Sequence, residues 1–414
     1  MATFGIVEKG GITTPAGFKA AGVHAGFRKN PLRLDFALVV ADEPAKTTGT
    51  FTQNKFCAAP VIFDREQLHA VDGKCGVAAI QAIAINSGNA NAATGTDGLE
   101  VAEKSAGLVA DGLGIDASQV LVASTGVIGV PLPLEPFENG IPVAVEKLSA
   151  EGGLDAARAI MTTDTRYKQV AVKIDGSELG LDGEFHIGGM VKGSGMIQPN
   201  MATMIAVITT DVPLGDDVMP SLFRAAVDRS FNCVTVDSDT STNDTAIFMS
   251  SGKGAEIALG TPACDAFREA LNFVCIELAK KIAVDGEGAT RIVQVTVDGA
   301  KDDADALIAA RAVANSPLVK TAIAGHDANW GRVAAALGKS GAEFKQENTD
   351  IDFLKMPVLR NGLPIPFDED EALRRFEETQ IDIDCNLGEG GGHAVIWTCD
   401  LTHDYISINA DYRS

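Results

Sequence analysis

The segment Lys192–Met204, KGSGMIQPNMATM, holds the residues best suited to covalent chemistry. Its glycines, Pro199 and Asn200 favour turns and leave the backbone exposed. The run MIAVITTD, which begins at Met204, consists mostly of strand formers. We therefore expect Thr203 to lie where an exposed loop enters a buried strand.

A hydroxyl at such a point can attack the carbonyl group of the residue before it, here Ala202, and turn the peptide bond into an ester that water hydrolyses. Cleavage would give Thr203 a free α-amine with a pKa of about 8. That amine can deprotonate its own hydroxyl, which activates the threonine without a histidine partner. By residue type alone, an ordinary Gly/Pro/Asn loop before a strand is the commoner interpretation, so the hypothesis needs support from the rest of the chain.

Motifs along nearly the whole chain resemble, in order, those of the ornithine acetyltransferase family, also called the bifunctional arginine biosynthesis protein. Several of them are highly specific, which makes a chance match implausible. Besides Lys192–Met204, they are GITTPAGFKAAGVHAG (Gly11–Gly26), INSGNANAATG (Ile85–Gly95), VASTGVIG (Val122–Gly129), MTTDT (Met161–Thr165), VTVDSDTSTND (Val234–Asp244), DGEGATR (Asp285–Arg291), DANWGR (Asp327–Arg332) and YISINADYRS (Tyr405–Ser414).

The resemblance implies self-cleavage between Ala202 and Thr203 into an α chain, Met1–Ala202, and a β chain, Thr203–Ser414. The halves would stay associated, commonly as two α and two β chains. The implied reaction moves an acetyl group from N-acetyl-L-ornithine to L-glutamate through acetyl-Thr203, with ping-pong kinetics and no cofactor. Bifunctional members also acetylate glutamate from acetyl-CoA, and the motifs do not distinguish the two kinds of member.

The resemblance also assigns the remaining site residues. Thr125 and Gly126 would form the oxyanion hole, since a glycine after a strand lets a backbone N–H approach a reacting carbonyl. Without the resemblance, each position has an ordinary interpretation: a strand-ending turn, a solvated lysine, a polar turn or a frayed tail. The residues implied to bind substrate, together with Thr203, are Lys192, Glu287, Asn409, Ser414 and either Thr162 or Thr163.

Strand and helix patterns interleave along the chain, which indicates an α+β or mixed α/β fold. The resemblance implies stacked β-sheets between helical layers, as in certain self-cleaving aminopeptidases, and a smaller α/β lobe is expected in the C-terminal half. Residues Val130–Pro142 are predicted to be a loop and Leu387–His393 a glycine-rich hairpin. The strands expected are Leu34–Val40, Val77–Ile85, Val120–Ala123, Val170–Ile174, Met204–Thr209, Ile292–Val297 and Ile381–Cys385, and the helices are Val101–Leu113, Val218–Ser230, Asp265–Ala283 and Glu369–Glu378.

Composition narrows the class of protein further. The 414 residues carry a net charge of -22, which argues against nucleic-acid or membrane partners. The 7 cysteines contain no CxxC pair and the 6 histidines no ligand pattern, so neither a disulfide framework nor a metal is expected. No secretory signal or membrane span is evident, which predicts a cytoplasmic protein. Two alternatives stay open: a self-processing amidohydrolase or aminopeptidase, and an uncleaved binding protein.

Overall fold

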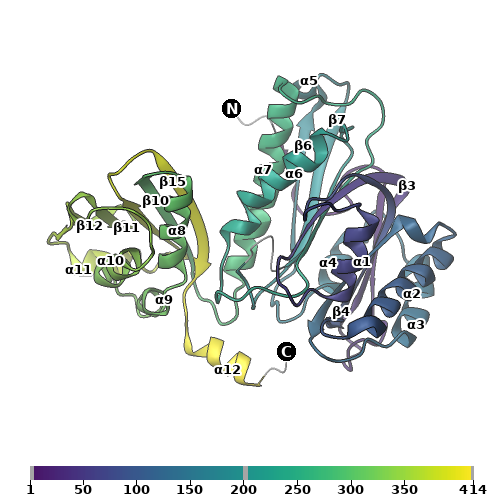
Figure 1. Cartoon of the computed structure of the whole chain (residues 1–414), viewed down its shortest axis with the longest axis horizontal. Helices are drawn as coiled ribbons and strands as arrows, with labels where there is room; N and C mark the ends of the chain where they lie inside the picture. The colour runs from purple at the N-terminus through teal and green to yellow at the C-terminus, as the bar shows by residue number, and fades with distance from the viewer. Residues whose placement is uncertain (1–3, 199–203, 412–414) are drawn as a thin grey trace.

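A computed structural model describes residues 4–198 and 204–411, which form a larger and a smaller lobe (Figure 1). In the described part of the chain the larger lobe has one nine-stranded sheet, ordered β1-β6-β7-β8-β9-β3-β4-β5, with β2 paired to β3. Its strands are β1 (Phe4–Ile6), β2 (Phe18–Val23), β3 (Phe36–Phe51), β4 (Ala78–Asn89), β5 (Val120–Val127), β6 (Lys168–Asp175), β7 (Glu184–Lys192), β8 (Ile205–Thr210) and β9 (Thr245–Ser250).

Helices cover both parts of this sheet. One hydrophobic core joins strands β6–β9 to the helices α6 and α7, and another joins β2–β5 to α2 and α3. A third core lies on the other face of both parts and contains residues of β4, β8 and α4. The helices of this lobe are α1 (Ala59–Gln67), α2 (Gly95–Leu113), α3 (Glu135–Glu146), α4 (Gly153–Ala159), α5 (Gly176–Leu179), α6 (Val218–Asp228) and α7 (Pro262–Val284).

Strand β8 is buried on both faces, which explains its continuous apolar run. Its alternate residues Ala206 and Ile208 enter the core beneath α7, while Ile205 and Val207 enter the opposite core. β8 pairs antiparallel with β7 and parallel with β9, so it occupies the interior of the sheet. The strand expected directly after Thr203 is therefore confirmed, and it is central.

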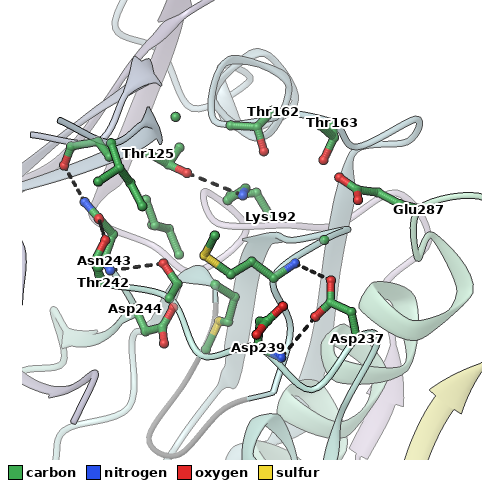
Figure 2. A pocket seen from close by; sticks show the side chains of 18 of the residues that line it. Thr125, Thr162, Thr163, Lys192, Asp237, Asp239, Thr242, Asn243, Asp244 and Glu287 are labelled. Atoms are coloured by element: carbon green, nitrogen blue, oxygen red, sulfur yellow. Dashed lines mark hydrogen bonds between the residues drawn. The ribbon is translucent and has the colours of Figure 1, made fainter. Parts of the chain in front are cut away.

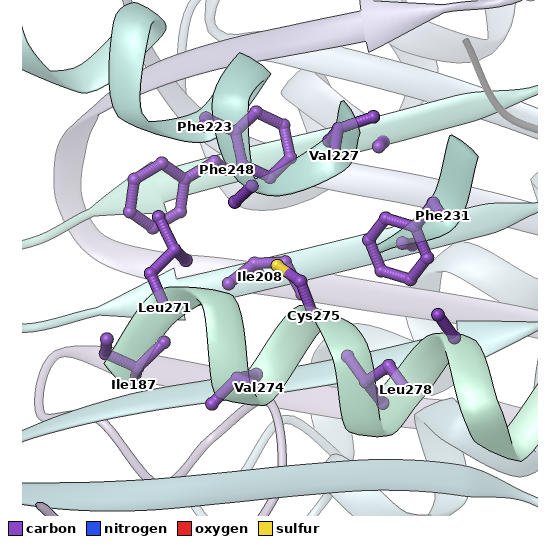
Figure 3. Packing of buried hydrophobic residues seen from close by; sticks show 14 of the residues in the cluster. Ile187, Ile208, Phe223, Val227, Phe231, Phe248, Leu271, Val274, Cys275 and Leu278 are labelled. Atoms are coloured by element: carbon purple, nitrogen blue, oxygen red, sulfur yellow. The ribbon is translucent and has the colours of Figure 1, made fainter. Parts of the chain in front are cut away.

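Helix α7 closes the core over this part of the sheet (Figure 3). The helix begins at Pro262, and the hydroxyl of Thr261 accepts a hydrogen bond from the Cys264 N–H, an arrangement that favours helix initiation. Figure 3 shows Leu271 of α7 beside the ring of Phe248 on β9, and Leu278 belongs to the same buried cluster. The apolar stripe predicted for Asp265–Ala283 is thus the buried face of the helix.

Two predictions about connections are wrong. Residues Val130–Pro142 are not all loop, because α3 begins at Glu135. A proline in the first turn, here Pro136, loses no helical hydrogen bond, and burial of Phe137 and Ile141 stabilises the rest of the helix. The glycine-rich segment Leu387–His393 does not close a hairpin either, because β10 lies between the two strands that the segment connects.

The smaller lobe has a six-stranded sheet among the described residues, ordered β13-β12-β11-β14-β10-β15 and packed against helices α8–α11. These layers confirm the predicted fold class and the C-terminal lobe. The last helix, α12, leaves this lobe and runs toward the larger one (Figure 1). The elements are β10 (Ile292–Ala300), β11 (Asp350–Phe353), β12 (Met356–Arg360), β13 (Leu363–Pro364), β14 (Gln380–Asn386), β15 (Gly392–Cys399), α8 (Asp303–Ala314), α9 (Pro317–Ala324), α10 (Trp330–Gly338), α11 (Glu369–Arg375) and α12 (His403–Asp411).

Candidate active site

A cavity of about 250 Å³ lies where β5 and β7 end, β8 begins and α12 returns from the smaller lobe (Figure 2). Segments far apart in the sequence meet here, and each of them belongs to a motif recognised in the sequence. The cavity is lined by Ala90, Thr125, Gly126, Ile128, Thr162, Thr163, Lys192, Gly195, Met196, Met204, Ile205, Asp237, Asp239, Ser241, Thr242, Asn243, Asp244, Glu287, Tyr405 and Asn409.

Thr125 and Gly126 lie near the end of the parallel pairing between β4 and β5, where Gly126 is opposite Gly88. The φ angle of Gly126 is 138°, and a Cβ there would lie 2.3 Å from the Gly88 carbonyl carbon and 2.5 Å from the Asn89 nitrogen. Only glycine fits such a backbone at such close approach. The sequence thus brings a hydroxyl and an unshielded peptide group to one wall of the cavity.

Lys192 is the last residue of β7, and its Nζ donates to Thr125 Oγ1 over 3.4 Å. Its side chain is buried, and burial lowers the pKa of Lys192, while the nearby Asp164 carboxylate opposes that shift. Burial alone would raise the pKa of Asp164, but the charges of Lys168 and Lys192 outweigh it and hold that pKa well below its usual range. The lysine is therefore a compensated buried cation and not a solvated one.

Glu287 and Asn409 are in direct contact at the cavity wall, although 122 residues separate them in the sequence. Asn409 Nδ2, on α12, donates to Glu287 Oε2 over 2.7 Å. Glu287 is buried three residues after α7 ends, and a Cβ at Gly195 would lie 2.3 Å from its carboxylate, so this glycine admits the glutamate. The predicted tail residue Asn409 is held by a contact with the site.

Thr162 and Thr163 both line the cavity, and Figure 2 shows them side by side near Lys192 and Glu287. The Thr162 N–H donates to Asp164 Oδ2 over 2.9 Å, which fixes the backbone of this turn. The geometry keeps both threonines as candidates.

Three of the predicted positions cannot be placed. Ala202, Thr203 and Ser414 lie outside the described residues. Met204 and Ile205, which follow Thr203, do line the cavity.

An acidic loop that had no assigned role forms the opposite wall. The carboxylate of Asp237 accepts hydrogen bonds from the N–H groups of Met196 at 2.6 Å and Ile197 at 2.8 Å, and Tyr405 Oη donates to it over 3.3 Å. Burial and the Asp237 charge raise the pKa of the Tyr405 phenol. Asp237 belongs to the recognised motif VTVDSDTSTND, but its partners lie at sequence distances that no local pattern specifies.

Asn243, in the same loop, fixes the entrance to β9. Its Nδ2 donates to the carbonyl groups of Ala90 at 2.5 Å and Ser124 at 2.8 Å, which joins the loop to the chain on either side of the β4–β5 ends. The hydroxyl of Thr242 donates to Asn243 Oδ1. Asn243 therefore supports the wall that carries Thr125.

Within residues 4–198 and 204–411, no three histidine, cysteine or acidic side chains are grouped as metal ligands. The same residues include no helix with the length and apolar character needed to cross a bilayer. What the cavity offers is a buried ammonium, carboxylates, hydroxyls and close backbone groups. A concave pocket with few convergent polar groups is the usual form of an enzyme active site.

Comparison with known proteins identifies the family. The model of the ArgJ family matches residues 19–414, and the chain belongs to this family. A protein of Chlorobaculum tepidum named arginine biosynthesis bifunctional protein ArgJ is 47% identical over 402 residues, covering 97% of this chain and 96% of that protein. A chloroplastic protein of the same name from Sorghum bicolor is 43% identical over 416 residues, covering 98% and 88%. The resemblance drawn from the motifs is confirmed, and the chain is an enzyme.

Two solved structures of similar proteins each match about half of the chain. A chain of the arginine biosynthesis bifunctional protein argJ of Bacillus halodurans is 42% identical with a TM-score of 0.49, covering 50% of this chain and 98% of its own. Ornithine acetyltransferase of Mycobacterium tuberculosis, complexed with ornithine, is 37% identical with a TM-score of 0.42, covering 48% and 100%.

Proposed function

We propose that this enzyme of arginine biosynthesis transfers an acetyl group from N-acetyl-L-ornithine to L-glutamate through an acetyl-Thr203 ester. One observation carries the proposal: a single cavity collects Thr125, Gly126, Lys192, Glu287 and Asn409 from separate segments of the chain. Chance would not gather the residues that the motifs assign to one reaction. The names of the relatives agree with this pathway.

In the first half-reaction the Thr203 hydroxyl oxygen attacks the acetyl carbonyl carbon, and the free α-amine of Thr203 takes the hydroxyl proton. The developing oxyanion accepts hydrogen bonds from the Thr125 hydroxyl and the Gly126 peptide group. A donor of this kind accelerates acyl transfer by about 10²–10³-fold. The C–N bond to ornithine then breaks, and the departing amine takes up the proton.

In the second half-reaction the α-amine of glutamate attacks the ester carbonyl, and Thr203 regains its proton as its oxygen leaves. Lys192 supplies a buried positive charge for a substrate carboxylate, and Glu287 with Asn409 supplies acceptor and donor groups for the remaining polar atoms. Thr162 or Thr163 and Ser414 complete the proposed substrate contacts.

Self-cleavage at Ala202–Thr203 would leave two fragments that share one sheet. β7 belongs to the first and β8 to the second, and the two strands pair over six residues from Ile187↔Thr210 to Lys192↔Ile205. β3 and β9 pair across the same division. Because these hydrogen bonds do not depend on the peptide bond at the cut, we expect the α and β chains to remain associated. An assembly of two α and two β chains is what the family resemblance implies.

The test compares the wild-type protein with Thr203→Ala. The wild type should give two fragments by intact mass, one beginning Thr-Met-Ile-Ala, and should release ornithine from N-acetylornithine with parallel double-reciprocal plots as glutamate is varied. The variant should remain full-length, folded and inactive. A cleaved Thr203→Ala protein would contradict the assignment of the nucleophile.

The acceptor is tested separately. If glutamate leaves the rate of ornithine release unchanged and acetate accumulates, water is the acceptor and the protein is an amidohydrolase. Formation of N-acetylglutamate from acetyl-CoA and glutamate, without N-acetylornithine, would add the second activity of the bifunctional members.

A further inference from the structure

Lys168 is a buried lysine that lies next to the cavity without lining it. It is the first residue of β6, it pairs with Val191 of β7, and its residue exposure is 1%. Its Nζ donates to Asp164 Oδ1 at 2.5 Å, to Asp285 Oδ2 at 2.5 Å and to the Arg166 carbonyl at 3.3 Å. All three protons of the ammonium group therefore have acceptors.

The two carboxylates extend this contact to the segments around the cavity. Asp164 accepts hydrogen bonds from the Thr162 N–H and from the Gly193 N–H at 2.8 Å, beside Lys192. Asp285 accepts from the Thr165 N–H at 3.1 Å. Its own carbonyl accepts from the Ser194 hydroxyl at 2.6 Å. Thus the three segments that carry the threonines, Lys192 and Glu287 converge on one ammonium group.

Stability alone does not explain this arrangement. Buried ion pairs are often no more stabilising than well-packed apolar side chains of the same volume, because desolvation offsets the attraction. Other residues on the same face of β6, such as Val170 and Val172, contribute to an apolar core. A charged side chain at this position can form directional hydrogen bonds to the two carboxylates, which an apolar side chain cannot. These carboxylates in turn orient backbone N–H groups beside the cavity.

We propose that Lys168 is a positioning residue for the substrate pocket, whose two ion pairs hold the Thr162–Thr163, Lys192 and Glu287 segments in register. The proposal rests on the function proposed above. It also has an electrostatic consequence, because Lys168 is one of the charges that face Lys192, together with Asp164, Glu287 and Arg28. Burial lowers the pKa of Lys192 and the charge of Lys168 lowers it further, while the two carboxylates raise it.

Lys168→Met is the primary test, and Lys320→Met is the matched control. Lys320 is also buried, but it lies in the smaller lobe and donates to Thr398 Oγ1 and the Cys399 carbonyl. We expect Lys168→Met to raise KM for N-acetylornithine at least tenfold. It should also shift the alkaline limb of the kcat/KM–pH profile to a higher pH by about one unit. Removal of the neighbouring positive charge raises the pKa of Lys192, so this lysine stays protonated to a higher pH. Lys320→Met should leave that limb unmoved.

A second measurement does not depend on catalysis. The pH dependence of acetylation of Lys192 by acetic anhydride, read by peptide mass spectrometry, reports the pKa of this amine directly.

If Lys168→Met does not fold, the charge-balanced variant Lys168→Met/Asp285→Asn keeps an acceptor for the Thr165 N–H and serves in its place.

The outcomes separate the two proposals. An inactive wild type whose Lys192 midpoint still rises when Lys168 is replaced would reject the proposed function and keep the electrostatic contact between Lys168 and the pocket. An unchanged midpoint together with an unchanged KM would overturn the positioning role whatever the activity. A uniform loss of kcat at every pH, with neither KM nor the limb altered, would also overturn it, since it would mark Lys168 as merely structural.

Discussion

Replacing Gly126 by alanine isolates the backbone geometry of the proposed oxyanion hole. The added methyl group would collide with the Gly88–Asn89 peptide, its nearest atom being 2.3 Å away. Gly129, three residues later, offers a matched control. Its φ angle is also positive, at 77°, but an added Cβ there meets nothing within 4 Å.

The two substitutions differ in the free energy that they cost. A non-glycine residue in a left-handed conformation costs about 1–2 kcal/mol, which is the whole effect expected for Gly129→Ala. Gly126→Ala adds the clash with β4, and forcing extra atoms into a packed region costs a further ~1–3 kcal/mol. Relief of that clash must move the Gly126 peptide, which would carry its N–H away from the proposed oxyanion position. Loss of one oxyanion donor reduces kcat by about 10²–10³-fold.

Both substitutions should be made in two backgrounds. Calorimetry of the uncleaved Thr203→Ala chain measures stability without the complication of two fragments, and Gly126→Ala should lower Tm by more than Gly129→Ala. Steady-state transfer from N-acetylornithine to glutamate, measured in the otherwise unmodified protein, gives kcat. A Gly126→Ala enzyme with wild-type kcat, or equal Tm losses for the two variants, would refute the argument that close approach at Gly126 shapes the site.

Two further substitutions test the C-terminal helix α12 and the ion pair between β7 and the residue after β8. Asn409→Leu removes the hydrogen-bond donor to Glu287. Since such a hydrogen bond is worth ~1–1.5 kcal/mol, the substitution should raise KM for N-acetylornithine about tenfold. An unchanged KM with normal self-cleavage would show that this contact is dispensable. Asp211 raises the pKa of His186, so this pair stabilises the fold below the unfolded pKa of about 6.5, and the stabilisation is lost as pH rises through the raised folded value. The Tm difference between wild type and His186→Gln should therefore shrink from pH 5 to pH 9, and a constant difference would contradict it.

Local patterns predicted the elements whose burial follows a simple period. The stripe of α7 and the apolar run of β8 were both found, because each is set by the side of the element that faces the core. The helix that begins at Glu135 escapes a sequence-based prediction because its prolines favour a loop, although a proline in the first turn is compatible with a helix. The partners of β10 were missed for another reason. Insertion of this strand between β14 and β15 depends on contacts across the whole lobe.

The candidate site shows the same division. Thr125, Lys192, Glu287 and Asn409 were named because each lies in a recognisable motif, and the structure brings them to one cavity. Asp237 was not assigned a role, although it lies in a motif as well. Its function as an acceptor for two loop N–H groups and a tyrosine hydroxyl depends on segments 41 and 168 residues away. The sequence identifies candidate polar residues such as Asp237, but their hydrogen-bond partners are known only from the fold.

Lys168 shows what a charged residue at the start of an apolar strand pattern indicates. Successive side chains of a strand alternate between faces, so Lys168 shares a face with Val170, Val172 and Ile174, all of them buried. A lysine in line with core residues must find acceptors, since an unpaired buried ammonium is very costly. The pattern RYKQVAVKID therefore predicts a buried cation with carboxylate partners. It does not say which of the chain's 56 acidic residues they are, because one partner is four residues away and the other 117. The strand pattern thus indicates that Lys168 has acidic partners, and the topology of the fold determines which residues they are.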